Sequence, residues 1–245
     1  PPAYGARAPL ITPRPRLLLF DLDDTLCDYA TARDQRRRIA FRHALAHRSH
    51  VQRIDIDQLV IDSIAIDPHD AEHFGDLLRR HGVDDPTAAA TAAAWYRTHR
   101  FHGLSLFADA EATLATLRSS LSRPDGRIGL ITNGPTEVQR AKIELLQIAR
   151  LVDFIIISEE FGHWKPDLAI FAEALRLGEA TAREAIFIGD SVEHDMAGAR
   201  TAGIRSVWVN RTGRPWVEPE PPPDFQITAL GDLPRLLGVT SNSAP

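Results

Sequence analysis

The 245-residue sequence has a single cysteine, Cys27, and its apolar runs are short. One cysteine excludes an intramolecular disulfide and is typical of a reducing compartment. Runs such as LLLF and FIII are far shorter than the ~18 residues that a membrane-spanning helix needs. The first twenty residues also lack the apolar segment of a secretory signal. We therefore expect a cytoplasmic protein with no membrane partner.

The sequence also lacks an excess of positive charge. Its formal net charge is -5, and nucleic-acid binding needs a concentrated basic surface, so we expect no nucleic-acid partner. Lysine is scarce, because only Lys142 and Lys165 occur among the 28 lysine and arginine residues. With 44% apolar residues, the chain can bury a substantial core, as one large domain or as a core with a smaller module. Monomer and homodimer both stay open.

Short apolar runs recur along the chain, and many of their residues are β-branched. They cover residues 16–20, 127–131, 154–157, 185–189, 206–209 and 224–227. Segments with helical spacing alternate with the later runs, at residues 137–148, 168–177 and 193–202. Strands that are buried on both faces and alternate with helices are typical of a parallel sheet. We therefore predict an α/β fold with a Rossmann-like parallel sheet flanked by helices.

Two stretches depart from this alternation. Residues 1–15 hold five prolines and no apolar periodicity, which predicts a flexible proline-rich extension. Residues 28–105 separate the first apolar run from the others and contain several segments that look helical. An insertion of that length must form a module of its own. We predict a core of residues 16–27 and 106–245, with residues 28–105 as a second, smaller α-helical cap domain.

Polar side chains directly follow four of the apolar runs. They are Asp21, Thr132, Ser158 and Asp190. In a parallel sheet the carboxyl ends of the strands lie at one edge, where ligands bind. Carboxylates that converge there repel one another unless a hard cation lies between them, and Mg²⁺ takes oxygen ligands that include phosphate oxygens. The acids that begin at Asp21 therefore indicate a site for Mg²⁺ and a phosphoryl group.

Four motifs, in this order, resemble those of the haloacid dehalogenase (HAD) superfamily in its phosphatase branch. They are DLDDT (21–25), LITNG (130–134), Lys165 within WKPD (164–167) and GDSVEHD (189–195). The resemblance covers residues 17 to about 210, and the inserted helical module corresponds in position to the cap of the family. It implies a Mg²⁺-dependent phosphatase that hydrolyses a small phosphorylated metabolite through an aspartyl-phosphate intermediate.

The resemblance also implies roles for individual residues. Asp21 becomes the nucleophile that attacks phosphorus, and Asp23 becomes the general acid and base. The hydroxyl of Thr132 and the backbone amides of Asn133 and Gly134 become donors to the phosphoryl group. Lys165 would neutralise both the nucleophile and the transferred group, a task that suits a compact ammonium.

The same resemblance implies the metal ligands. Asp21 and Asp190 would hold Mg²⁺ through their carboxylates, and Asp23 would hold it through its backbone carbonyl. We interpret Asp195 as support for these ligands.

Other activities stay open. A phosphomutase of the same fold, similar to β-phosphoglucomutase, would return the phosphoryl group to its substrate. A 2-haloacid dehalogenase needs no acid for its leaving group and lacks the second aspartate, so Asp23 favours phosphoryl transfer. Outside the enzymes, a receiver-like protein with a phosphorylated aspartate has about half this length, and a non-catalytic binding protein would not need intact motifs.

The arginines of the predicted cap allow two interpretations. Arg33, Arg36 and Arg37 belong to a basic stretch that precedes an acidic one, so the two stretches can neutralise each other. Alternatively, one of these arginines grips a second anionic group of the substrate.

Overall fold

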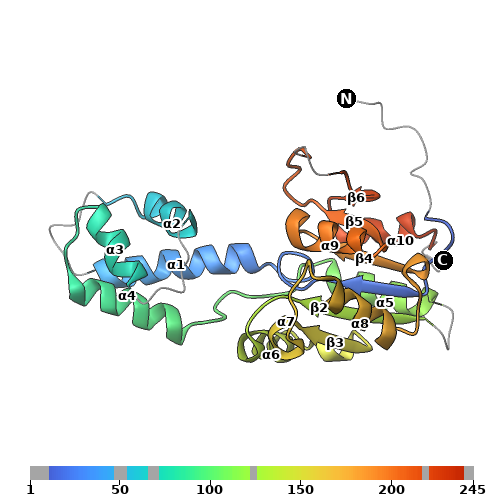
Figure 1. Cartoon of the computed structure of the whole chain (residues 1–245). Coiled ribbons are helices and arrows are strands. Elements are labelled where there is room, and N and C mark those ends of the chain that lie inside the picture. The colour runs from blue at the N-terminus through green and yellow to red at the C-terminus, as the bar shows by residue number, and fades with distance from the viewer. Residues whose placement is uncertain (1–10, 47–53, 66–71, 122–125, 217–220, 240–245) are drawn as a thin grey trace. The chain divides into compact units, whose positions relative to one another are not determined.

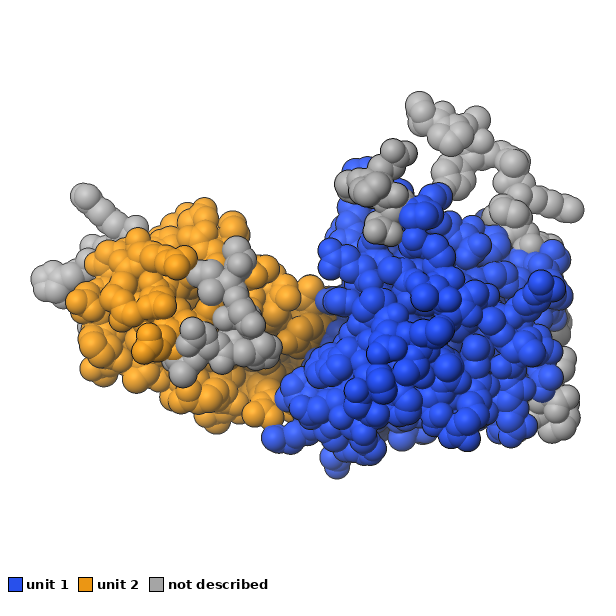
Figure 2. Space-filling view, viewed as in Figure 1, with its two compact units in different colours: residues 1–27, 106–245 blue, residues 28–105 orange. Residues whose placement is uncertain are grey.

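The computed structural model of the chain (Figure 1) describes residues 11–46, 54–65, 72–121, 126–216 and 221–239. The chain divides into two compact units (Figure 2). Residues 1–27 and 106–245 form one, which we call the core unit, and residues 28–105 form the other, which we call the helical unit. None of the described helices is long and apolar enough to cross a membrane.

The described residues of the core unit form a six-stranded sheet in the order β3-β2-β1-β4-β5-β6 (Figure 1). The strands are β1 (Leu17–Phe20), β2 (Arg127–Thr132), β3 (Phe154–Ile157), β4 (Ala185–Gly189), β5 (Arg205–Val209) and β6 (Phe225–Ile227). Every neighbouring pair is parallel. The predicted Rossmann-like α/β fold is confirmed, and each predicted run forms a strand.

The central strand β1 is fully buried on both faces, because helices pack against the sheet. Leu17 and Leu19 point to the same face and belong to an apolar cluster with Phe171 and Phe187. The rings of Phe171 and Phe187 lie 5.3 Å apart and are fully buried, which stabilises the fold by roughly 1.5–3 kcal/mol for each side chain. Leu18 points to the other face and is equally buried.

Helices and short helical turns connect the strands of the core unit. The α-helices are α5 (Ala110–Ser120), α6 (Thr136–Leu145), α7 (Ser158–Phe161), α8 (Leu168–Leu177), α9 (Ala197–Thr201) and α10 (Leu233–Leu236). The 3₁₀ turns are η1 (Ile148–Arg150), η2 (Ala182–Glu184) and η4 (Leu230–Asp232), and η3 (Val192–Met196) is a π-helical turn. Helix α8 spans the residues expected from the sequence because Asp167 caps it, accepting from the Ala169 amide at 2.9 Å.

The helical unit consists of α1 (Tyr29–Leu45), α2 (Ile56–Ala65), α3 (His73–Arg80) and α4 (Pro86–Thr98) in its described part. Its apolar cluster includes Phe41 of α1 and Phe74 of α3, whose ring centroids lie 5.4 Å apart. Asp85 caps α4 and Pro86 occupies its first turn, a position where the missing amide hydrogen costs nothing. Packing of apolar helix faces therefore holds this unit together.

The N-terminal segment differs in part from the sequence prediction. Residues 1–10 lie outside the described residues. Ile11 is buried, and its amide donates to the Leu236 carbonyl at 3.0 Å. The loose extension predicted over residues 1–15 therefore does not include Ile11, whose side chain is buried and whose backbone bonds to that of Leu236.

Candidate active site

The strand ends bring the predicted residues to one edge of the sheet. Asp21 follows β1, Thr132 ends β2, Ser158 follows β3 and Asp190 follows β4. The Asp21 amide continues the ladder by donating to the Ile188 carbonyl at 3.0 Å. The strand order changes direction between β1 and β4, and such a switch point is where ligands bind in open α/β sheets. Asp21 and Asp190 lie on its two sides.

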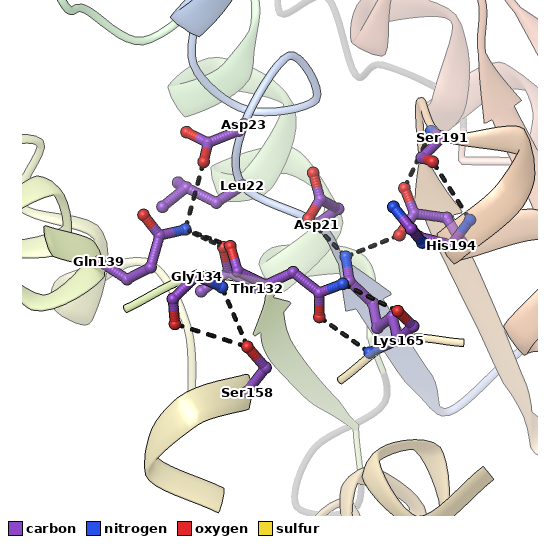
Figure 3. Close-up of polar contacts among 12 residues, drawn as sticks. Asp21, Leu22, Asp23, Thr132, Gly134, Gln139, Ser158, Lys165, Ser191 and His194 are labelled. Carbon is purple, nitrogen blue, oxygen red and sulfur yellow. Dashed lines mark hydrogen bonds and ion pairs between the residues drawn. The ribbon is translucent and has the colours of Figure 1, made fainter. Parts of the chain in front are cut away.

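Lys165 is the cation at the centre of this edge (Figure 3). Its Nζ lies 2.5 Å from Asp21 Oδ1 and 2.6 Å from Asp195 Oδ1. The three side chains are at most 9% exposed. Burial by itself lowers the pKa of Lys165, but the charges of Asp195 and Asp21 outweigh it and the pKa lies above its usual value. The ammonium is therefore held charged.

The acids outnumber this cation. Carboxylate oxygens of Asp21, Asp190 and Asp195 all lie within 4.8 Å of one another. Burial raises the pKa of Asp21, and the charges of Asp195 and Asp190 raise it further, while Lys165 opposes this. Burial and the charges of Asp195 and Asp24 raise the pKa of Asp190 to about 7. When all three are ionised, three carboxylates and one ammonium carry two net negative charges, which is the charge that a divalent cation neutralises. The donor set thus fits an oxygen-binding ion such as Mg²⁺.

Asp195 is fixed in this group by the turn that precedes it. Its Oδ2 accepts from the Ser191 amide at 3.0 Å, so both of its oxygens have partners. A Cβ on Gly189 would lie 2.3 Å from this Oδ2, so the strand end must be glycine for the carboxylate to fit. The sequence predicted an α-helix from residue 193, but the chain forms the π-helical turn η3 first. Such turns are frequent at functional sites.

The segment after β2 holds the loop that carries Lys165. The Asn133 side chain donates from Nδ2 to the Lys165 carbonyl at 2.9 Å and accepts the Lys165 amide at 2.8 Å. The Gly134 amide donates to Ser158 Oγ at 3.0 Å. Asn133 therefore positions Lys165 through its side chain, a contact that the sequence did not predict. In this arrangement the Gly134 amide is engaged with Ser158 and does not offer a hydrogen to a phosphoryl oxygen.

Asp23 faces another set of partners. Its Oδ2 lies 2.7 Å from Lys142 Nζ and 3.2 Å from Gln139 Nε2, and Figure 3 shows Gln139 between Asp23 and Thr132. Its Oδ1 lies 3.5 Å from the Cys27 sulfur. Burial, with the Asp23 charge beside it, raises the pKa of the Cys27 thiol far above its usual value, so this thiol stays protonated.

Sequence reasoning missed Lys142 and Gln139. Both lie on α6, where residues three positions apart share a face, and both are buried, with exposed fractions of 3% and 1%. The scarcity of lysine was the one signal in the sequence. These contacts place both lysines of the chain beside aspartates of the same motif.

Comparison with known proteins agrees with the motifs. A family model described as haloacid dehalogenase-like hydrolase matches residues 18–209. The glyceraldehyde 3-phosphate phosphatase of Methanopyrus kandleri is 31% identical over 230 residues, which cover 91% of this chain and 95% of that protein.

Solved structures show the same fold. The HAD-hydrolase YfnB from Bacillus subtilis, described as bound to magnesium, matches with a TM-score of 0.72 at 24% identity and covers 91% of this chain and 99% of that chain. A 2-haloacid dehalogenase from Pseudomonas syringae pv. Tomato matches with a TM-score of 0.58 at 30% identity and covers 91% of this chain and 97% of that chain.

Proposed function

Since the chain belongs to the haloacid dehalogenase-like hydrolase family, we propose that it is a Mg²⁺-dependent phosphatase that hydrolyses a small phosphorylated metabolite through an aspartyl-phosphate on Asp21. One observation carries the proposal. Asp21 lies against a buried, charged Lys165 at the switch point of the sheet, whereas Asp23 faces a different lysine. A nucleophile and an acid-base group thus stand two positions apart in separate surroundings. The phosphatase that is 31% identical supports the same activity.

In the first step the Asp21 carboxylate attacks phosphorus, an oxygen-phosphorus bond forms and the ester bond breaks. Asp23 in its protonated form gives its proton to the leaving oxygen, which departs as an alcohol. Lys165 offsets the negative charge that Asp21 and the phosphoryl group bring together. Two unit charges 4 Å apart interact by about 4 kcal/mol at an effective dielectric of 20, so this cation matters to the transition state.

In the second step a water molecule attacks the same phosphorus atom. Asp23, now a carboxylate, takes the proton from this water, and the bond between Asp21 and phosphorus breaks. Inorganic phosphate leaves, and both aspartates return to their initial states. The Thr132 hydroxyl would donate to a phosphoryl oxygen in both steps, because it ends the strand next to β1.

The metal ligands in this proposal are the carboxylates of Asp21 and Asp190 and the backbone carbonyl of Asp23. Asp195 supports them, since its oxygens already bind Lys165 and the Ser191 amide. When bound, Mg²⁺ supplies positive charge against the phosphoryl oxygens. We further propose that the helical unit acts as the cap that selects the substrate, and that the enzyme acts in the cytoplasm.

A 2-haloacid dehalogenase is the second candidate, because a structure with that name is 30% identical. Asp23 argues against it, since a departing halide needs no proton. A phosphomutase differs from a phosphatase only in where the phosphoryl group goes.

A panel assay separates these activities. The purified chain is incubated with p-nitrophenyl phosphate, with phosphorylated sugars and acids, and with 2-chloropropionate, each with Mg²⁺ or EDTA. We expect phosphate release that EDTA abolishes. Halide release without phosphate release would identify a dehalogenase, and sugar phosphate isomerisation that needs a bisphosphate would identify a mutase. Stable binding without any turnover would contradict an enzyme.

A further inference from the structure

We propose that Lys142 and Gln139 of α6 are positioning residues for Asp23, which hold one carboxylate oxygen and leave the other for proton exchange with the substrate. The inference rests on the proposed function, because it assigns Asp23 the acid-base role. None of the roles that the motifs imply belongs to a residue of α6.

The contacts of the two Asp23 oxygens are unequal. Oδ2 receives the Lys142 ammonium at 2.7 Å and the Gln139 amide at 3.2 Å. Oδ1 contacts only a thiol, that of Cys27 at 3.5 Å, among the hydrogen bonds found in the described residues. A thiol is a weak donor, so Oδ1 is the oxygen that can turn its lone pair or proton toward a leaving group or a water molecule.

Burial supports the same division. The Lys142 side chain is 4% exposed, whereas the Asp23 side chain is 24% exposed. The ammonium therefore approaches the carboxylate from the protein interior, while part of the Asp23 side chain stays accessible. A flexible surface lysine would lose much rotamer freedom to make such a contact. Lys142 is buried, so the surrounding protein already restricts its side chain.

Gln139 connects Asp23 to the phosphoryl-binding segment. Its Nε2 also contacts Thr132 Oγ1 and lies 3.1 Å from the Asn133 carbonyl. A Cβ on Gly134 would lie 2.9 Å from Gln139 Cγ, so the glycine of the second motif makes room for this side chain. One amide group thus contacts both the acid-base carboxylate and the hydroxyl that would donate to the phosphoryl group.

The two lysines also keep the two catalytic carboxylates apart. Asp21 turns toward Lys165 and Asp23 turns toward Gln139 (Figure 3), and Lys142 Nζ also contacts Asp23. Like charges two positions apart in a turn would otherwise compete for the same cation. Because Asp23 contacts the ammonium of Lys142, it does not disturb the ion pair between Asp21 and Lys165.

The test compares Lys142→Met with Arg140→Met, a matched loss of a cation on the same helix. Arg140 is an exposed residue that pairs with Glu160. The substrates are p-nitrophenyl phosphate and phenyl phosphate, and single-turnover release of the phenol isolates the first step. Phenolate is the poorer leaving group and depends more on a proton from Asp23.

We expect Lys142→Met to slow phenol release by about 10²-fold and nitrophenol release by much less, because a misplaced catalytic group costs about that factor. The KM for both substrates should change by less than about threefold, since the phosphoryl contacts remain. Arg140→Met should match the wild type. Gln139→Met, which removes the amide and adds no charge, should change the ratio of the two rates in the same direction by about tenfold.

Formation of the Asp21 complex with beryllofluoride and Mg²⁺, followed by ¹⁹F NMR, shows whether each variant keeps its folded site. If Lys142→Met forms this complex yet slows both phenols equally or neither, the inference is overturned. If Lys142→Met does not fold, an unchanged rate ratio in Gln139→Met overturns the inference in its place. A wild-type protein without Mg²⁺-dependent phosphate release would instead overturn the proposed function.

Discussion

The core unit and the helical unit both bury cationic side chains, but they surround them differently. Lys165 and Lys142 in the core unit contact carboxylates at 2.5–2.7 Å. In the helical unit the Arg36 guanidinium lies 3.8 Å from the centre of the Tyr96 ring, and Arg37 reaches Asp34 only at 4.0 Å.

This contrast follows from the architecture of the two units. A parallel sheet brings the ends of distant strands to one edge, so polar residues after separate strands must meet. Helices that pack by their apolar faces impose no such meeting point. Catalytic geometry can therefore be inferred from motifs in the core unit, whereas the polar contacts of the helical unit depend on packing details.

The largest effect should come from Asp21, the proposed nucleophile. Asp21→Asn keeps the shape of the side chain but removes its nucleophilic charge, so we expect kcat for p-nitrophenyl phosphate to fall by at least about 10³-fold. Asp76→Asn, which changes a partly exposed acid of the helical unit paired with Arg79, should keep wild-type activity. Phosphate release is the measurement. A comparable loss of activity in both variants would contradict the expectation that the catalytic acid lies in the core unit.

Loss of a cation should destabilise the two units unequally. Lys165→Met leaves Asp21 and Asp195 buried without their counter-charge, and breaking such a buried pair costs about 3–5 kcal/mol. Arg38→Met in the helical unit removes a partly exposed pair with Asp57, whose side chains are 33% and 68% exposed, and such a pair is worth about 0–1 kcal/mol. Urea unfolding, followed by tryptophan fluorescence, gives both values. Equal costs would show that the contacts of Lys165 are no more than surface pairs.

The response to Mg²⁺ should depend on pH in the core unit. The pKa of Asp190 is raised from 3.8 to about 7, first by burial and then by Asp195 and Asp24. The folded protein therefore keeps a proton that the unfolded chain has lost, so this contribution to stability is full below pH 3.8 and is lost as the pH rises to about 7. Mg²⁺ must displace that proton at low pH but not above pH 7.

We thus expect Mg²⁺ at 100 times its Kd to stabilise the protein by about 2.7 kcal/mol, which raises Tm by about 5–10 °C. Calorimetry should give this rise near pH 8 and a clearly smaller one near pH 5.5 at the same Mg²⁺ concentration. In Asp190→Asn the difference between the two pH values should become smaller, and the remainder belongs to Asp21, whose pKa burial also raises. A Mg²⁺ effect that is independent of pH in the wild type would contradict the ligand role of Asp190.

The smallest effect on stability should come from Arg37. Its side chain is 2% exposed, and its Nε and Nη1 have no hydrogen-bond partner among the described residues. Burial lowers the pKa of this guanidinium. Arg37→Met should therefore be neutral or stabilising, since an apolar side chain of similar volume often replaces a buried charge without loss. Chemical unfolding tests this, and a cost above about 3 kcal/mol would contradict it.

Arg37→Met also decides between the two interpretations of the cap arginines. If Arg37 grips a second anionic group, the KM for phosphorylated acids rises while that for p-nitrophenyl phosphate stays the same. Equal KM values in variant and wild type for both substrates would assign Arg37 to packing alone.

Much of the core unit could be predicted from the sequence because a local apolar run marks each of its strands. Apolar runs buried on both faces gave the strands, and parallel pairing then placed Asp21, Thr132 and Asp190 at one edge. The family resemblance was confirmed by the match over residues 18–209. The residue roles that it implies remain predictions, for which the ion pairs of Lys165 give a physical basis.

The contacts that the sequence did not predict depend on the direction in which side chains point. Helical spacing shows that Gln139 and Lys142 share a face of α6, but it does not show that this face turns toward Asp23. The side-chain clamp from Asn133 to Lys165 joins residues 32 positions apart, so no local pattern contains it. The scarcity of lysine was the one usable sign, because both lysines of a chain that otherwise uses arginine contact aspartates of the same motif.

Covalent chemistry at Asp21 is the central claim, and rapid acid quenching tests it most directly. The enzyme is mixed with p-nitrophenyl phosphate and Mg²⁺, quenched during the first turnover, digested and examined by mass spectrometry. We predict a phosphoryl group on the peptide that begins at Leu17, located at Asp21 and absent when EDTA replaces Mg²⁺. Steady release of phosphate with Asp21 unmodified, or with the phosphoryl group on another residue, would contradict it.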